Sequence, residues 1–103
     1  MTGYGPQENW PESERIPFFL ALEEEIVKAE LAGKSILIEL DANSKLGPQL
    51  IQEDLHTQSE NGKLLAAIIE RHGVVIGNSL KQLYLYLYKS AKLTMVLRGY
   101  TTN

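Results

Sequence analysis

A short apolar run that ends in turn-forming residues is the feature that most constrains the fold of this chain. Residues 36–40, Ile-Leu-Ile-Glu-Leu, favour a strand, and the residues that follow, Asp41, Asn43 and Ser44, favour a turn. The pattern predicts a buried strand whose carboxyl end carries polar side chains. Alternate residues of a strand share a face, so we expect Asp41 and Asn43 to point the same way, at the strand end where α/β proteins usually place chemistry.

The residues before this strand predict a loop and then a helix. Residues 2–11 are punctuated by glycine and proline and favour a loop, which we expect to follow a segment preceding this chain. Apolar residues recur at helical spacing over 17–32, and Ser13 and Glu14 are candidate caps. Gly33 ends the predicted helix.

The residues after the strand predict a second helix and a second strand. Ser59 or Asn61 can start a helix that runs to about His72 and ends at Gly73. The apolar residues 74–76 then predict a short strand. Alternation of helices and strands predicts an α/β layer in which the helices cover the strands.

The last part of the chain differs in character. Leu and Tyr alternate over 83–88, which favours a strand, although Leu80, Tyr84 and Tyr88 also fit helical spacing. Residues 93–97 predict a further strand. The tyrosines can stack single-stranded bases or pack against a neighbouring strand, and the second role is the commoner one.

Composition excludes several classes of function. Thirteen acidic and ten basic residues give a net charge of −3, so the chain has no overall basic field for attracting nucleic acid. A phosphodiester substrate would therefore need a local cluster or a bound cation. The absence of cysteine excludes disulfides and thiolate metal sites. Without an apolar run near the ~20 residues that span a bilayer, and without a signal-peptide pattern, we expect no membrane partner and, by default, a cytoplasmic or nuclear protein.

Three motifs in order resemble a known family. They are Gly-Tyr-Gly-Pro at 3–6, Ile-Leu-Ile-Glu-Leu-Asp-Ala-Asn at 36–43 and Asn-Gly-Lys-Leu-Leu at 61–65. This part of the chain resembles the middle of the endonuclease/exonuclease/phosphatase superfamily, most closely the apurinic-endonuclease-like domain of non-LTR retrotransposon endonuclease-reverse transcriptases. The resemblance implies a partial four-layer α/β sandwich of the DNase I-like type, with helices packed on a mixed sheet. Residues 1–79 would form its central part and 80–103 a divergent C-terminal segment.

The resemblance also implies roles for three residues in magnesium- or manganese-dependent cleavage of DNA. Tyr4 matches the tyrosine that contacts the scissile phosphate, and its phenol can donate a hydrogen bond. Asp41 matches the aspartate that aligns or deprotonates the attacking water, and it is our candidate metal ligand. Asn43 matches the asparagine that orients this aspartate and the phosphate.

The chain also departs from the family pattern. Ala42 stands where the family has an aromatic residue, which by strand alternation alters packing more than chemistry. The family's metal-binding glutamate belongs to strands before the tyrosine, and no Asp or His follows Asn78 to match its carboxyl-terminal Asp-His. We therefore expect the isolated chain to be inactive or nearly so. The alternative is a non-catalytic α/β interaction module that associates through exposed sheet edges.

Three further polar residues have simpler interpretations. His72 lies in the last turn of a predicted helix, where a cationic ring suits the helix dipole. His56 lies near two acidic residues in a polar loop, an irregular spacing that favours solvated side chains over a metal site. Glu39 shares the predicted face of Asp41, and we expect it to be structural or at the surface.

Overall fold

The computed structural model describes residues 2–41, 43–48, 50, 57–77 and 93–98, which form a small α/β fold. The elements, in chain order, are β1 (Thr2–Tyr4), α1 (Glu12–Leu31), β2 (Ile36–Asp41), α2 (Glu60–His72), β3 (Val75–Ile76) and β4 (Leu93–Leu97). The expected α/β class is therefore confirmed. The predicted strands over 36–40, 74–76 and 93–97 are present as β2, β3 and β4.

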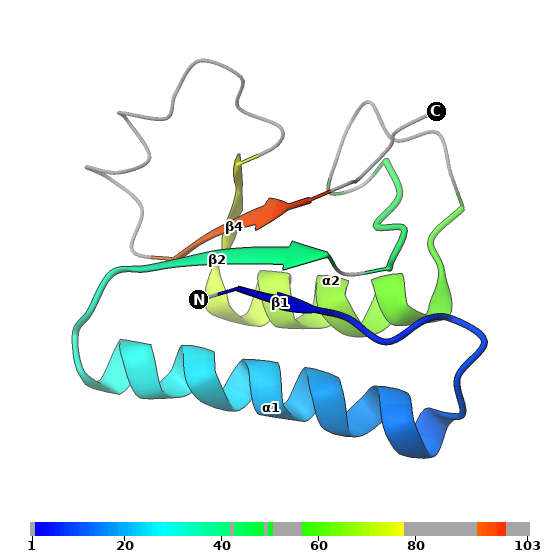
Figure 1. The fold of residues 1–103 in the computed structure, drawn as a ribbon. Helices are drawn as coiled ribbons and strands as arrows, with labels where there is room; N and C mark the ends of the chain where they lie inside the picture. Colours follow the sequence, from blue (N-terminus) through cyan, green and yellow to red (C-terminus); the bar gives the residue numbers. More distant parts are fainter. Residues whose placement is uncertain (1, 42, 49, 51–56, 78–92, 99–103) are drawn as a thin grey trace.

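The described strands form one parallel sheet in the order β1-β2-β4-β3 (Figure 1). β4 lies between β2 and β3, so the last described strand occupies the interior of the sheet. All pairings among these strands are parallel, whereas a mixed sheet was expected. The parallel arrangement has a simple cause, because a helix connects β1 to β2 and another connects β2 to β3, and such crossovers return the chain in the same direction.

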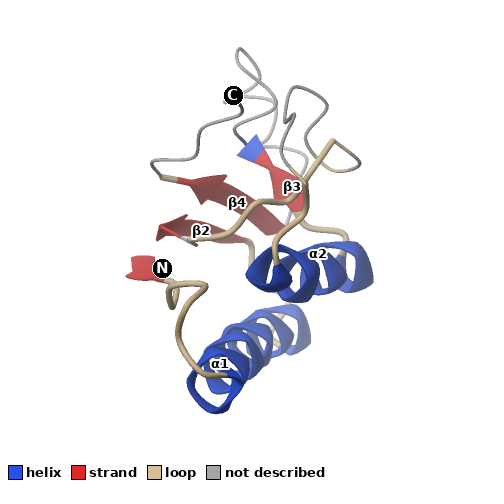
Figure 2. Cartoon of the chain, turned by 90° about the vertical axis from the view of Figure 1, so that its right-hand side faces the viewer, coloured by secondary structure: helices blue, strands red, loops and turns tan. Residues whose placement is uncertain are grey.

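Both helices cover the same face of the sheet, as Figure 2 shows. Alternate residues of β2, Ile38 and Leu40, are buried against them, while Leu37, the residue before Ile38, is exposed on the other face. The core contains the following buried apolar residues: Phe19, Leu22, Ile26, Ile38, Leu40, Leu46, Leu65, Ala66, Ile68, Ile69, Val74, Ile76, Leu93, Met95 and Leu97. Their burial between one sheet face and the two helices is the main stabilising contribution to the fold.

α1 begins five residues earlier than the sequence predicted, at Glu12 rather than at Pro17. Pro17 consequently lies inside the helix, and no side chain caps the amino terminus. The extra turn is held by Arg15, whose Nε donates to the Trp10 carbonyl (2.8 Å) and whose Nη1 donates to Asn61 Oδ1 (3.1 Å). A contact with a distant part of the chain therefore sets this helix start.

α2 begins and ends as predicted. Ser59 is its N-cap, and the Ser59 hydroxyl accepts a hydrogen bond from the Gly62 amide (3.0 Å). Gly73 follows the last turn with a φ of 63°, the left-handed conformation that glycine adopts easily. Local sequence determines both ends of this helix.

One expected loop is a strand in the structure, and two other expectations fall on residues that the structure does not describe. Residues 2–4, expected to be part of a loop, form β1, because a strand this short is recognisable only through its pairing with β2. The Leu/Tyr alternation over 83–88 and His56 lie outside the described residues. Within the described part of the chain, no helix is both long and apolar enough to cross a membrane.

Candidate functional site

Tyr4 and Asp41 are neighbours across adjacent strands. Tyr4 is the register partner of Asp41, each at the last position of its strand. The preceding pair, Gly3 and Leu40, faces the helices, since a Cβ on Gly3 would lie 3.6 Å from Leu40 Cδ1. Strand alternation therefore places Tyr4 and Asp41 on the opposite face of the sheet, where Tyr4 is 73% exposed.

Asn43 is joined to the same edge by the backbone of Gly5. The Gly5 amide donates to the Asp41 carbonyl, and Asn43 Nδ2 donates to the Gly5 carbonyl (2.7 Å). The expectation that Asp41 and Asn43 share a strand face does not apply, because β2 ends at Asp41 and Asn43 has a φ of 48°. Asn43 instead reaches the loop after β1 from a left-handed turn, a conformation that asparagine tolerates better than most residues.

Asn61 holds the loops beneath this edge. Its side chain is fully buried, and its Nδ2 donates to the carbonyls of Pro6 (2.8 Å) and Asn43 (3.5 Å). Its Oδ1 accepts from Arg15, and its backbone amide donates to the Glu8 carboxylate (3.0 Å to Oε1). One amide thus connects the loop after β1, the loop after β2, α1 and α2.

Gly62 allows α2 to lie directly against the backbone after β2. A Cβ at this position would lie 1.8 Å from the Lys45 carbonyl oxygen, a backbone atom that cannot move aside cheaply. Ser59 bonds the same segment, since its hydroxyl accepts from the Lys45 amide (2.9 Å) and its own amide donates to the Lys45 carbonyl (3.0 Å). The Asn-Gly pair at 61–62 therefore has a structural role in positioning the backbone of Asn43 and Lys45.

Arg98 is the site residue that sequence reasoning missed. It follows β4 directly, and its amide donates to the Leu40 carbonyl (2.9 Å). Its Nη2 donates to the Gly3 carbonyl (2.7 Å), and its Cζ lies 5.0 Å from the centre of the Tyr4 ring. The available signal was a lone cation directly after the apolar run 93–97, at the strand end where Tyr4 and Asp41 also lie.

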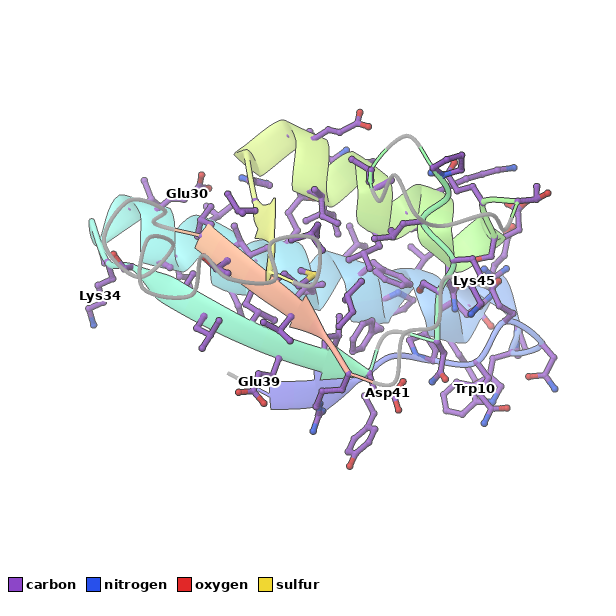
Figure 3. All side chains as sticks on the ribbon, turned by 90° about the horizontal axis from the view of Figure 1, so that it is seen from above. Trp10, Glu30, Lys34, Glu39, Asp41 and Lys45 are labelled. Carbon is purple, nitrogen blue, oxygen red and sulfur yellow. The ribbon has the colours of Figure 1, made fainter. Side chains whose placement is uncertain are left out.

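Figure 3 shows the carboxyl ends of the strands, where the candidate site lies, from the face of the sheet opposite the helices. Asp41 lies at the end of β2, on the side of the molecule that also carries Trp10 and Lys45, while Glu30 and Lys34 lie at the opposite end. Glu39 is half-buried on the face of Asp41, in register with Thr2 and Val96. This placement agrees with a structural or surface role for Glu39.

A second polar cluster joins the two helices away from this edge. Arg71 donates to both carboxylate oxygens of Glu23 (2.8 Å each), and the His72 ring contacts Glu23 Oε2 (2.7 Å) and Glu30 Oε1 (2.8 Å). The hydrogen bonds from Arg71 and, second, from His72 lower the pKa of Glu23. His72 is thus in the last turn of α2, as predicted, and also bridges two carboxylates of α1.

The described residues supply few metal ligands at the edge. They contain no group of three or more His, Asp or Glu side chains arranged to hold a metal ion. Asp41 carries the carboxylate in register with Tyr4, and the Asn43 carboxamide is bonded through Nδ2 to the Gly5 carbonyl. This set is compatible with Mg²⁺, which is commonly bound through one or two carboxylates while keeping water and substrate phosphate as its other ligands.

Comparison with known proteins does not place the chain in a family. No protein-family model, curated protein or solved structure matches it. The geometry of the edge and the chemistry of its side chains therefore carry the functional argument.

Proposed function

We propose that this chain is the central part of a magnesium-dependent phosphodiesterase domain that acts on DNA, built as part of a four-layer, DNase I-like sandwich. The observation that carries the proposal is the pairing of Tyr4 with Asp41 at the carboxyl ends of adjacent parallel strands. Asn43, the third residue of the set, is bonded to the Gly5 carbonyl, in the loop that follows β1. A phenol, a carboxylate and a carboxamide are thus gathered at one sheet edge.

These groups have complementary tasks in phosphodiester hydrolysis. The Tyr4 phenol donates to a non-bridging phosphate oxygen, and the Asp41 carboxylate orients the attacking water and accepts its proton. Asn43 Nδ2 bonds the Gly5 carbonyl and the Gly5 amide bonds the Asp41 carbonyl, so Asn43 helps to orient the backbone at Asp41. Asp41 would hold the Mg²⁺ ion, which supplies positive charge to the phosphate and lowers the pKa of a bound water.

The isolated chain is expected to cleave DNA slowly or not at all, because a single carboxylate provides few protein ligands for Mg²⁺. A plasmid-nicking assay with Mg²⁺ tests this, with Asp41→Asn as the inactive variant. Slow nicking that disappears in Asp41→Asn, or a rate too low to measure, agrees with the proposal. Robust cleavage by the wild-type chain would overturn the expected inactivity, and nicking that persists in Asp41→Asn would remove the role of Asp41.

Metal binding gives a test that does not require activity. Mn²⁺, a paramagnetic substitute for Mg²⁺, should broaden the backbone NMR signals of Tyr4, Gly5 and Asp41 first. Asp41→Asn should abolish this broadening, whereas Glu60→Gln should not, because Glu60 pairs with Lys63 on the exposed surface of α2. Broadening centred on Glu23 and Glu30 instead of Asp41 would contradict the proposed metal site.

A second candidate function is a non-catalytic interaction module, and the outer face of α1 favours it. Four apolar residues are exposed there at spacings that share one helix face: Ile16, Leu20, Val27 and Leu31, the last 85% exposed. The stripe is symmetric along the helix, with Ile16 and Leu31 as outer members and Leu20 and Val27 equally spaced about its midpoint. If α1 packed antiparallel on the α1 helix of a second copy, Ile16 would face Leu31 and Leu20 would face Val27.

Sedimentation at increasing protein concentration tests this second function. Self-association through α1 predicts a mass that rises with concentration and returns to the monomer value in Leu20→Lys. A Leu37→Lys variant, on the sheet, is the matched control and should still associate. Association that Leu37→Lys abolishes and Leu20→Lys leaves intact would assign the contact to the sheet, and a monomer at all concentrations would reject it.

A further inference from the structure

The Nε atom of Arg98 is a buried donor without an acceptor. Among the described side chains it is the one buried nitrogen or oxygen that lacks a hydrogen-bond partner. The other two arginines of the chain contrast with it: Arg15 Nε donates to the Trp10 carbonyl and Arg71 Nε donates to Glu23, both at 2.8 Å. Leaving a buried donor of a charged group unpaired is unfavourable, and most buried donors in folded proteins have an acceptor.

The rest of the Arg98 side chain is held in place. Nη2 is bonded to the Gly3 carbonyl, and the guanidinium lies over the Tyr4 ring. The backbone of Arg98 is bonded to Leu40, the neighbour of Asp41. The orientation of Nε is therefore set by contacts with β1 and β2.

No described carboxylate provides the missing acceptor. Asp41 is the nearest acidic residue in the sheet register, yet it forms no ion pair with Arg98 in the described structure. None of the described side chains therefore serves as the acceptor of Arg98 Nε. The N–H donors of a guanidinium form charge-assisted hydrogen bonds with oxyanions, and arginine is well suited to binding phosphate.

We propose that Arg98 Nε binds a phosphate oxygen at the carboxyl edge of the sheet, beside the Tyr4 phenol. The ligand class rests on the proposed function, whereas the site itself rests on the unpaired Nε and its fixed surroundings. Arg98 also positions Tyr4, because the cation packs against the ring that carries the phenol. The shared ligand chemistry is a phosphate oxyanion, either free or as a DNA diester.

The NMR signals of the three arginine Nε–H groups test this directly in the full chain. Inorganic phosphate and, separately, a dinucleoside phosphodiester would be titrated into ¹⁵N-labelled protein. The Arg98 signal should move downfield with at least one of them, while the signals of Arg15 and Arg71 remain in place because both already have acceptors. An Arg98 signal that neither ligand moves, or that already has the shift of a bonded group in their absence, would overturn the proposal.

Variants separate this site from the proposed function. Arg98→Lys keeps the charge but removes Nε, so its phosphate affinity should fall about tenfold, while Arg71→Lys should bind as the wild type does. Equal affinity in Arg98→Lys would reject the site. If phosphate shifts the Arg98 Nε–H signal but Mn²⁺ does not broaden the signal of Asp41, the anion site is supported and the phosphodiesterase proposal is rejected. If Mn²⁺ broadens the signal of Asp41 but phosphate does not shift the Arg98 Nε–H signal, the anion site is rejected and the proposed metal site is supported.

Discussion

Arg15 and Asn61 lie 46 residues apart in the sequence, and their side chains share a buried hydrogen bond of 3.1 Å between Nη1 and Oδ1. This bond connects the first turn of α1 to the first turn of α2. The same Asn61 side chain bonds the carbonyls of Pro6 and Asn43, on either side of the candidate site. The geometry of the site therefore depends on a residue that takes no part in its chemistry.

Asn61→Ala should destabilise the chain strongly. The change removes the Asn61 partner of Arg15 Nη1 and of the Pro6 carbonyl, at a cost of about 3 kcal/mol. Urea unfolding monitored by circular dichroism measures the free energy of unfolding. Asn9→Ala, at an exposed position, is the control and should change stability little. A loss in Asn61→Ala no larger than in Asn9→Ala would contradict the connecting role of Asn61.

Gly62→Ala should be far more harmful than Gly73→Ala. At position 62 the new methyl group would overlap the Lys45 carbonyl oxygen, which outweighs the gain of about 1 kcal/mol that alanine usually gives inside a helix. At position 73 a methyl group meets nothing within 4 Å, and the cost is the left-handed backbone alone, about 1 kcal/mol. Thermal unfolding of both variants gives the comparison. Equal losses would indicate that α2 does not lie against the Lys45 backbone.

Asn43 should be more sensitive to alanine than to glycine. Both changes remove the bond to the Gly5 carbonyl, but alanine adds the strain of a φ of 48°. We expect a loss of about 2 kcal/mol for Asn43→Ala and about 1 kcal/mol for Asn43→Gly. Denaturant titration of the two variants measures the difference. A glycine variant less stable than the alanine variant would contradict the left-handed turn.

Acid should weaken the contact between the helices through Glu23. The pKa of Glu23 is lowered in the folded chain, chiefly by Arg71 and then by His72, from its ordinary value of 4.5. This stabilisation is complete above the unfolded-state pKa and is lost as the pH falls through the lower, folded-state pKa. The unfolding free energy measured from pH 6 to pH 3 should therefore fall more steeply in the wild type than in Glu23→Gln.

The control for this measurement is Glu60→Gln, which removes one member of an exposed pair with Lys63. Its acid dependence should follow the wild type closely, since exposed pairs contribute little. Identical pH profiles for the wild type and Glu23→Gln would show that the Glu23 cluster does not stabilise the fold. Salt should reduce the difference, because the cluster lies near the surface.

Local patterns predicted the elements whose ends are determined by local chemistry. Ser59 and Gly73 bound α2 through a side-chain cap and a left-handed glycine, both of which are properties of those residues alone. The apolar runs of β2 and β4 were predicted for the same reason. In contrast, the start of α1 depends on Arg15 contacting Asn61, and β1 exists because it pairs with β2, so no short window of sequence reveals either.

The arrangement of the candidate site depends on strand pairing. Tyr4 and Asp41 were selected from the sequence, but their register pairing was not predicted, because residues 2–4 were expected to form a loop rather than β1. Arg98 was missed because its proximity to Tyr4 depends on β4 pairing with β2, a relationship between strands more than fifty residues apart that no sequence spacing encodes. The catalytic roles of these residues remain predictions until the experiments described above are done.

The position of β4 inside the sheet has a consequence for how the chain folds. During synthesis β2 and β3 emerge before the strand that separates them, and neither can complete its backbone pairing until residues 93–97 leave the ribosome. The long sequence separation of these pairings predicts slow, late consolidation of the sheet. Shortening the chain before Leu93 would remove the centre of the sheet rather than trim its margin, so we expect collapse of the whole fold.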